Sequence, residues 1–177
     1  MSGPRRAGRS AVLGVLALSL AGCANQVQPG GPDIQVVSGV TSPSVPAPTC
    51  SVTIPDTSTF PTVSTATLVP TGPAIATVCA YGGLNDPHPD ARGQTTTVTG
   101  NQLATLVGAL NAGGPPPPVP SNCPNNTDRS DLIVFGYNGG GLVDVRVSVT
   151  GCPLVTNGHR VLAVSPDMVN QLSALVG

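Results

Sequence analysis

The sequence predicts an α+β fold in which two helices pack on one face of an antiparallel sheet of about four to five strands. Three patterns carry this prediction. Two β-prone segments, "DLIVFGY" and "LVDVRVSVTG", flank the turn "NGGG" and indicate a hairpin. A leucine-rich stretch has the periodicity of an amphipathic helix. A Ser-Pro-Asp triplet near the C-terminus is typical of the start of a second helix.

The first strands and the first helix precede the hairpin. The apolar run "AIATVCAY" at 74–81 indicates a buried strand, and "TTTV" at 95–98 indicates a short one. The next apolar residues recur with the spacing of one helix face: Leu103, Leu106, Val107 and Leu110. Thr99 or Asn101 is a suitable N-cap for this helix. The proline run at 115–118 prevents the helix from continuing and forms a stiff spacer.

The hairpin occupies residues 131–137 and 142–151. In its second strand, valines alternate with the polar residues Asp144, Arg146 and Ser148. This alternation predicts a sheet with one buried face and one face in water. "RVLAV" at 160–164 indicates a further strand, and Ser165 caps the second helix. Three apolar residues of that helix are expected to face the sheet: Met168, Leu172 and Leu175.

The N-terminal residues indicate an exported protein. Residues 1–10 contain three arginines and no acid, and the eleven residues 11–21 are almost wholly apolar, which is the order of a signal peptide. A spanning helix needs about 20 apolar residues, so a membrane span is disfavoured. The sequence Leu20-Ala21-Gly22-Cys23 resembles the bacterial lipobox. The resemblance implies cleavage before Cys23 and attachment of diacylglycerol to its sulfur, with further acylation such as palmitate.

The lipobox accounts for the odd number of cysteines, which is five. Without Cys23, the remaining four are Cys50, Cys79, Cys123 and Cys152. An even set in an exported chain implies two disulfides. Four cysteines allow three pairings. The hairpin would bring Cys123 near Cys152, which favours that bridge and leaves Cys50 for Cys79.

Three segments follow from these features. Residues 1–22 are expected to be a cleaved signal peptide, and residues 50–177 a single disulfide-bonded domain. Residues 23–49 are expected to be a lipidated N-terminus with a disordered tether rich in Pro, Gly and Ser. Residues 50–71 are rich in Thr and Pro and are expected to be loosely structured. The predicted location is the extracellular face of the cell membrane, held there by the lipid anchor.

The composition excludes several classes of partner. From Cys23 onward the chain has four arginines, eight aspartates and no Lys or Glu, a net charge of −4. It therefore lacks the basic surface that nucleic acids require. It also lacks a polybasic patch for anionic lipid, so the acyl chains must supply membrane attachment. With two Phe, two Tyr and no Trp, the chain has few platforms for stacking sugars or bases.

The region from Cys79 to residue 164 resembles the Streptomyces subtilisin-inhibitor family. The matching features, in order, are "TVCAY", His88-Pro89, a helix ending in "ALNAGG", Cys123-Pro124 and "GCPLVTNGH". The resemblance implies a small secreted α+β domain with a five-stranded antiparallel sheet, two helices and two disulfides. It supports the pairing of Cys123 with Cys152.

The same resemblance implies a protease-binding loop directly after Cys123, formed by Pro124, Asn125 and Asn126. In that family this loop is extended and rigid, and Asn125 would enter the specificity pocket of the protease. Asn is a departure, because subtilisin-type pockets favour larger apolar or longer side chains. The resemblance therefore implies the fold of the family more strongly than it implies protease inhibition by this chain.

No catalytic site is predicted. His88 lies between Asp86 and Asp90, but the intervening prolines splay these side chains, and a solvated turn is the simpler interpretation. His159 is also expected in a loop, and no G-x-S-x-G motif is present. We therefore expect no enzyme, metal or cofactor. The expected function is a lipid-anchored, non-catalytic binding or scaffolding domain that contacts an envelope protein or a secreted protease; the alternative is a serine protease inhibitor.

Overall fold

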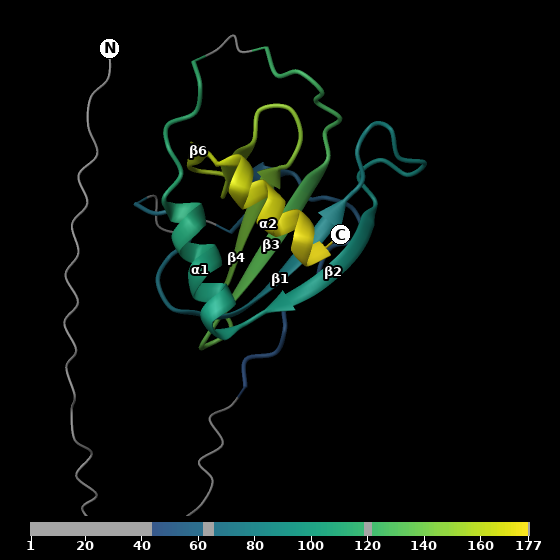
Figure 1. The fold of residues 1–177 in the computed structure, drawn as a ribbon. Coiled ribbons are helices and arrows are strands. Elements are labelled where there is room, and N and C mark those ends of the chain that lie inside the picture. Colours follow the sequence, from purple (N-terminus) through teal and green to yellow (C-terminus); the bar gives the residue numbers. More distant parts are fainter. Residues whose placement is uncertain (1–43, 62–65, 119–121, 177) are drawn as a thin grey trace, which may run out of the picture. The chain divides into compact units, whose positions relative to one another are not determined.

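A six-stranded antiparallel sheet with two helices on one face makes up the described part of the chain (Figure 1). The computed structural model describes residues 44–61, 66–118 and 122–176, all of which belong to the compact unit Thr41–Gly177. The α+β class is confirmed, with slightly more strands than predicted. The predicted signal peptide, Cys23 and the predicted tether up to residue 43 lie outside the described residues. For residues 44–49 the prediction of a disordered tether is wrong, because Pro48 is buried and its carbonyl accepts a hydrogen bond from the Thr77 hydroxyl.

The strands lie in the order β2-β1-β3-β4-β5-β6, and each neighbouring pair is antiparallel. Along the chain, the strands are β1 Pro73–Tyr81, β2 Arg92–Val98, β3 Ser130–Tyr137, β4 Leu142–Ser148, β5 Leu154–Thr156 and β6 Val161–Ala163. The helices are η1 Thr57–Thr59, a single 3-10 turn, then α1 Gly100–Asn111 and α2 Pro166–Val176. Strand β5 was not predicted from the sequence; it is only three residues long and follows directly after a Gly-Cys-Pro stretch.

The predicted hairpin is formed by β3 and β4, which pair without a break from Ser130 with Ser148 to Gly136 with Leu142. The turn is closed by a hydrogen bond from the Gly140 nitrogen to the Tyr137 carbonyl, at 3.0 Å. Gly139 and Gly140 have φ of +94° and +86°, which residues with a Cβ rarely adopt. The Gly-rich turn therefore has the composition that its backbone requires.

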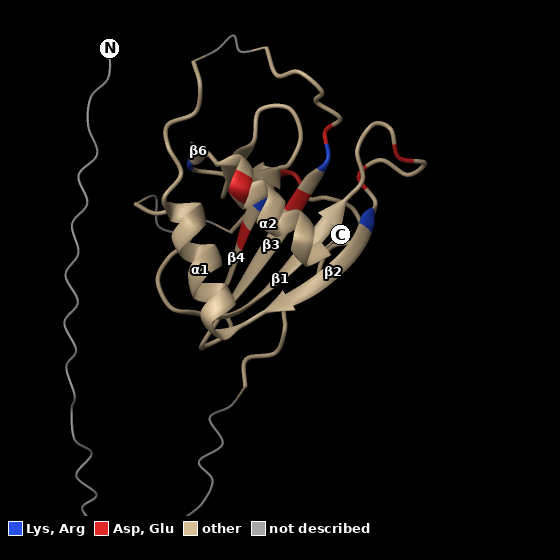
Figure 2. Ribbon diagram, viewed as in Figure 1, with Lys and Arg blue, Asp and Glu red and all other residues tan. Residues whose placement is uncertain are grey.

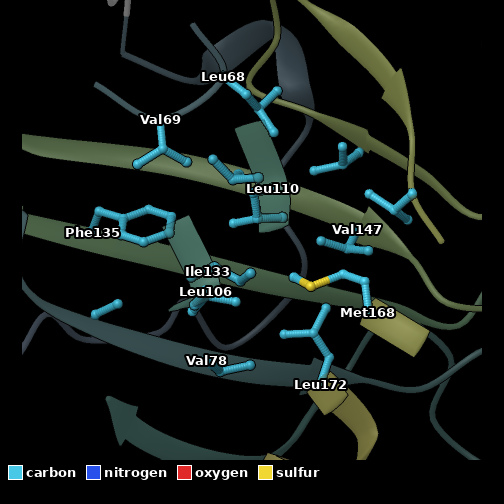
Figure 3. Packing of buried hydrophobic residues seen from close by; sticks show 14 of the residues in the cluster. Leu68, Val69, Val78, Leu106, Leu110, Ile133, Phe135, Val147, Met168 and Leu172 are labelled. Atoms are coloured by element: carbon cyan, nitrogen blue, oxygen red, sulfur yellow. The ribbon is translucent and has the colours of Figure 1, made fainter. Parts of the chain in front are cut away.

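The helix face of the sheet holds the larger core (Figure 3). Both helices contribute apolar residues that pack on β1, β3 and β4: Leu106, Leu110, Met168, Leu172, Val78, Ile133, Phe135 and Val147. Helix α2 begins as predicted, because the Ser165 hydroxyl accepts a hydrogen bond from the Met168 nitrogen at 3.2 Å. Thr99 is the N-cap of α1 but makes no side-chain cap bond.

Leu68 and Val69 also belong to this core and are almost completely buried. Asn111, at the end of α1, holds them in place: its amide donates to the Val69 carbonyl and accepts from the Val69 nitrogen, both at 2.9 Å. The expectation of a loosely structured segment is therefore wrong for this stretch. The physical reason is that two apolar residues and one amide are enough to dock an irregular segment.

The opposite face of the sheet is also covered, which corrects the expectation of one face in water. Residues 44–61, here called the strap, cross this face and cover the central strands. A second buried cluster lies beneath the strap: Phe60, Cys79, Tyr81, Leu132 and Val134, with Cys50 and Ile54 packed against it. The alternation in β4 was assigned correctly, but the sequence pattern did not reveal that another segment would cover the outward-facing side.

Candidate functional site

Both disulfides have the predicted pairing. Cys50 is bonded to Cys79, and Cys123 to Cys152, with Cα atoms 6.1 and 5.0 Å apart. The second bridge lies beyond the ends of the β3–β4 hairpin. It fixes one end of residues 124–128, here called the disulfide loop, which contains the predicted protease-binding residues.

The disulfide loop is held in one shape by side-chain hydrogen bonds. The Asn126 amide donates to the Asp128 carboxylate at 3.0 Å, and its oxygen accepts from the Asp128 nitrogen at 3.1 Å. The Thr127 nitrogen donates to the Thr150 hydroxyl at 3.2 Å, which ties the loop to the end of β4. Gly151 permits this contact, because a Cβ there would lie 2.8 Å from the Cβ of Asn126.

The backbone of the disulfide loop differs from the extended loop that the family resemblance implied. Pro124, Asn125 and Asn126 are exposed, as a binding loop requires. Asn125 and Asp128, however, both have φ of +57°, in the left-handed region. An extended strand-like loop has negative φ throughout. The position that would enter a protease pocket is therefore the inner residue of a turn.

A recess of about 370 Å³ lies beside the disulfide loop, on the strap side of the sheet. We call it the Arg146 recess. Its walls come from the strap, the loop after β1, the disulfide loop and β4: Ile54, Pro55, Asp56, Leu84, Pro89, Asp90, Asp128 and Arg146. The Leu84 nitrogen donates to the Thr127 carbonyl at 2.8 Å, which holds two of these walls together.

The recess combines one guanidinium with three carboxylates. Arg146 is half-buried and donates from Nε and Nη2 to the Ser130 hydroxyl, each at 3.3 Å. Hydrogen bonds from the backbone and side chain of Ser58 lower the pKa of Asp56 below its usual value, and Arg146 contributes a smaller electrostatic effect. Leu84, at the wall of the recess, is 66% exposed. The recess can therefore contact both polar and apolar groups.

This recess could not be predicted from the sequence, because its charged residues come from four separate segments. Figure 2 shows that the charged residues of the described chain lie mainly towards the end of the sheet away from the β3–β4 turn, on separate segments of the ribbon. Only Arg146 carried a usable signal, since the alternation in β4 places its side chain on the outer face. Nothing in the spacing of Asp56, Asp90 and Asp128 indicated that they would meet.

A second opening, of about 680 Å³, lies between residues 44–49 of the strap and residues 136–142 around the hairpin turn. We call it the hairpin cleft. The described residues that line it include none with a charged side chain. Gly136 allows the strap to pass closely, since a Cβ there would lie 3.2 Å from the Pro48 ring. The hairpin cleft is thus a mostly apolar counterpart to the Arg146 recess.

The two histidines stay apart from both openings. His88 and His159 are both exposed, and neither of them lines the Arg146 recess or the hairpin cleft. Within the described ranges, no cluster of three or more His, Cys, Asp or Glu side chains is arranged to hold a metal ion. Among the same residues, no helix has the length and apolar character needed to cross a membrane.

Comparison with family models, with curated proteins and with solved structures finds no match to this chain.

Proposed function

We propose that the protein is a lipid-anchored lipoprotein of the extracellular cell surface, whose folded domain binds or scaffolds another envelope component without catalysis. The pairing of the cysteines is the observation that carries this proposal. Cys50, Cys79, Cys123 and Cys152 are all used in disulfides. Cys23 is then the one cysteine available for acylation, and it lies directly after the lipobox residues.

The attachment of the strap supports an anchored domain. Three side chains of the sheet donate hydrogen bonds to strap carbonyls: Thr77 to Pro48 at 2.7 Å, Tyr81 to Ser51 at 2.9 Å and Arg92 to Cys50 at 2.8 Å. The disulfide from Cys50 reaches the same central part of the sheet, in β1. A pull along the preceding chain would therefore act on β1 through a covalent bond.

The anchor is tested by replacing its cysteine. The Cys23→Ala variant should move from the membrane fraction to the medium or the soluble fraction, and it should no longer incorporate labelled palmitate. The Asn25→Ala variant, altered two residues away, should remain membrane-bound and labelled. A Cys23→Ala protein that stays in the membrane fraction with its label would overturn the lipid anchor.

The Arg146 recess is the best candidate for the binding surface of this domain. It lies between a disulfide-braced loop and the strap, so its walls are ordered before any partner arrives, and this lowers the entropic cost of binding. Leu84 offers an exposed apolar contact at its wall. These features suit a protein or peptide partner with both polar and apolar groups.

This role is tested by cross-linking in intact cells. Leu84→Asp should abolish the cross-linked species formed by the wild-type protein. Val161→Asp, which changes an apolar residue that is 46% exposed in β6, should preserve them. Equal cross-linking by both variants would exclude the recess as the binding surface.

Serine protease inhibition is a second candidate, favoured by one observation: an exposed loop braced by the Cys123–Cys152 bridge. The left-handed backbone of Asn125 opposes it, because the loop would have to rearrange before entering a protease cleft. Inhibition of subtilisin-like enzymes that is lost on Asn125→Ala would support it. An absence of inhibition at micromolar concentration would remove it.

A further inference from the structure

The domain contains two Asn-Gly pairs, and they lie in opposite environments. Asn138-Gly139 forms the turn between β3 and β4, and Asn157-Gly158 follows β5. An asparagine followed by glycine is chemically labile, because the glycine nitrogen can reach the asparagine side chain without hindrance from a Cβ. Whether this happens depends on the freedom of both groups, and here the two sites differ.

The Asn157 side chain is locked. It is completely buried, and its amide group donates to the Leu68 carbonyl at 3.0 Å. Its side-chain oxygen accepts from the nitrogens of His159 and Arg160, at 3.1 and 2.9 Å. The nitrogen of Gly158, which would be the attacking atom, donates to the Thr156 hydroxyl at 3.0 Å. Reaction at this pair would require all of these contacts to open.

The Asn138 side chain is free by the same criteria. It is exposed, and no hydrogen bond joins it to any described residue. The Gly139 nitrogen likewise makes no hydrogen bond within the described part of the chain. Two backbone hydrogen bonds close the turn, from the Gly140 nitrogen to the Tyr137 carbonyl and from the Tyr137 nitrogen to the Gly141 carbonyl, both at 3.0 Å. Neither bond involves Asn138 or Gly139, and glycine at 139 and 140 tolerates wide backbone rotation.

We propose that Asn138 is a site of spontaneous deamidation in the folded protein, and that the fold protects Asn157 from the same reaction. The Gly139 nitrogen gives its proton to solvent base and attacks Cγ of Asn138. The new N–Cγ bond forms as the Cγ–Nδ2 bond breaks, and ammonia leaves after taking a proton from water. Water then opens the resulting succinimide at either carbonyl, which leaves aspartate or isoaspartate at position 138.

Either product changes the hairpin cleft. Both place a carboxylate beside an opening that has no charged side chain among its described lining residues. The isoaspartate form also adds a methylene to the backbone of the turn, which alters the geometry that joins β3 to β4. The modification would therefore accumulate with the age of the protein and would add negative charge beside residues 44–49 of the strap.

Trypsin separates the two sites, because the chain has arginines at 129, 146 and 160 and no lysine. Each Asn-Gly pair then lies in its own peptide, 130–146 or 147–160, and each peptide contains one asparagine. The purified full-length protein is incubated in warm, mildly alkaline buffer, then reduced, alkylated and digested. Mass spectrometry follows the conversion of amide to carboxyl, and an isoaspartyl methyltransferase assay identifies the isoaspartate product.

In the folded protein, peptide 130–146 should convert at least about a hundredfold faster than peptide 147–160, since several hydrogen bonds must open to release Asn157. In denaturant with the disulfides reduced, the two rates should become similar. Asn138→Gln should abolish conversion of the first peptide, because the longer side chain forms a six-membered ring much less readily. Equal rates in the folded protein, or a slow Asn157 in the unfolded chain, would overturn the proposal.

Discussion

The two faces of the sheet are covered by different means. On one face, α1 and α2 close a large apolar cluster, and on the other the strap closes a smaller one. A helix satisfies its own backbone hydrogen bonds, so the helices need only apolar contacts to dock. The strap has little regular structure, and its carbonyls need outside donors.

The sheet supplies those donors through Thr77, Tyr81 and Arg92, whose side chains each bond to a strap carbonyl. The Cys50–Cys79 disulfide adds a covalent link. The comparison shows that an irregular segment can cover a sheet where polar side chains and a disulfide replace the internal bonding of a helix. Changes on the helix face should therefore affect the whole fold, whereas changes under the strap should have local effects first.

The largest destabilisation is expected from the helix face. Phe135→Ala removes a completely buried ring from the centre of the larger cluster and should lower the free energy of unfolding by about 3–5 kcal/mol. Thr95→Ala, on the exposed part of β2, should change it by less than about 0.5 kcal/mol. Urea unfolding of both variants provides the measurement. A similar, small effect for the two would contradict the assignment of the core.

Removal of the strap disulfide comes next. The double variant Cys50→Ala with Cys79→Ala should lower the free energy of unfolding by about 2–4 kcal/mol. Amide hydrogen exchange should increase first in the strap. Cys123→Ala with Cys152→Ala is the matched control, since both bridges have a sequence separation of 29. In this control variant, amide hydrogen exchange should increase in the disulfide loop. If the first variant exchanged uniformly over the whole sheet, the strap would not be a local unit.

Replacement of Asp131 should stabilise the protein, in contrast to the two preceding changes. Asp131 is buried at the end of the helix face, next to Val147. Burial raises the pKa of Asp131 to about 6, and Arg129 offsets this only in part. The folded protein therefore binds the proton more tightly than the unfolded chain. Stability from this group is greatest at low pH and is lost as the pH rises from about 4 through about 6.

Asp131→Asn should accordingly raise the free energy of unfolding by about 1–3 kcal/mol at neutral pH. Near pH 4 the variant and the wild type should differ little. Thermal or urea unfolding across this pH range measures both effects. A constant difference between the two proteins at every pH would show that the carboxyl does not titrate in this way.

The smallest effect is expected from a single hydroxyl. Tyr81→Phe removes the hydrogen bond to the Ser51 carbonyl and should lower the free energy of unfolding by about 1 kcal/mol. Tyr137→Phe removes the corresponding bond to the Pro70 carbonyl, at 2.9 Å, on the other side of the sheet. Exchange should increase in the strap for the first variant and near Pro70 for the second. Increases in the same segment for both would contradict the separation of the two faces.

Much of the fold could be predicted because its signals are local. The leucine spacing in α1, the valine alternation in β4 and the Ser165 cap of α2 each act within a few residues. The hairpin then brought Cys123 towards Cys152, so local pairing also favoured one disulfide map over the others. Strand β5 lacked such a signal, because a three-residue strand is too short to show alternation.

The Arg146 recess and the strap could not be predicted in the same way. The burial of Leu68 and Val69 depends on Asn111, more than forty residues later in the chain. The recess depends on four segments that meet only when the sheet has formed. The strap sequence shows neither helical nor strand periodicity, and its position follows from bonds that the sheet donates.

The sequence by itself determined the α+β class and the main elements, and it favoured the disulfide pairing that the structure shows. These follow from periodicity, turn chemistry and composition, which act over short distances. Export of the chain stays a prediction. Only the tertiary structure decided that both faces of the sheet are covered, that the disulfide loop turns at Asn125, and that Asn138 is free while Asn157 is locked. Those outcomes depend on partners far away in the chain, which no local pattern can specify.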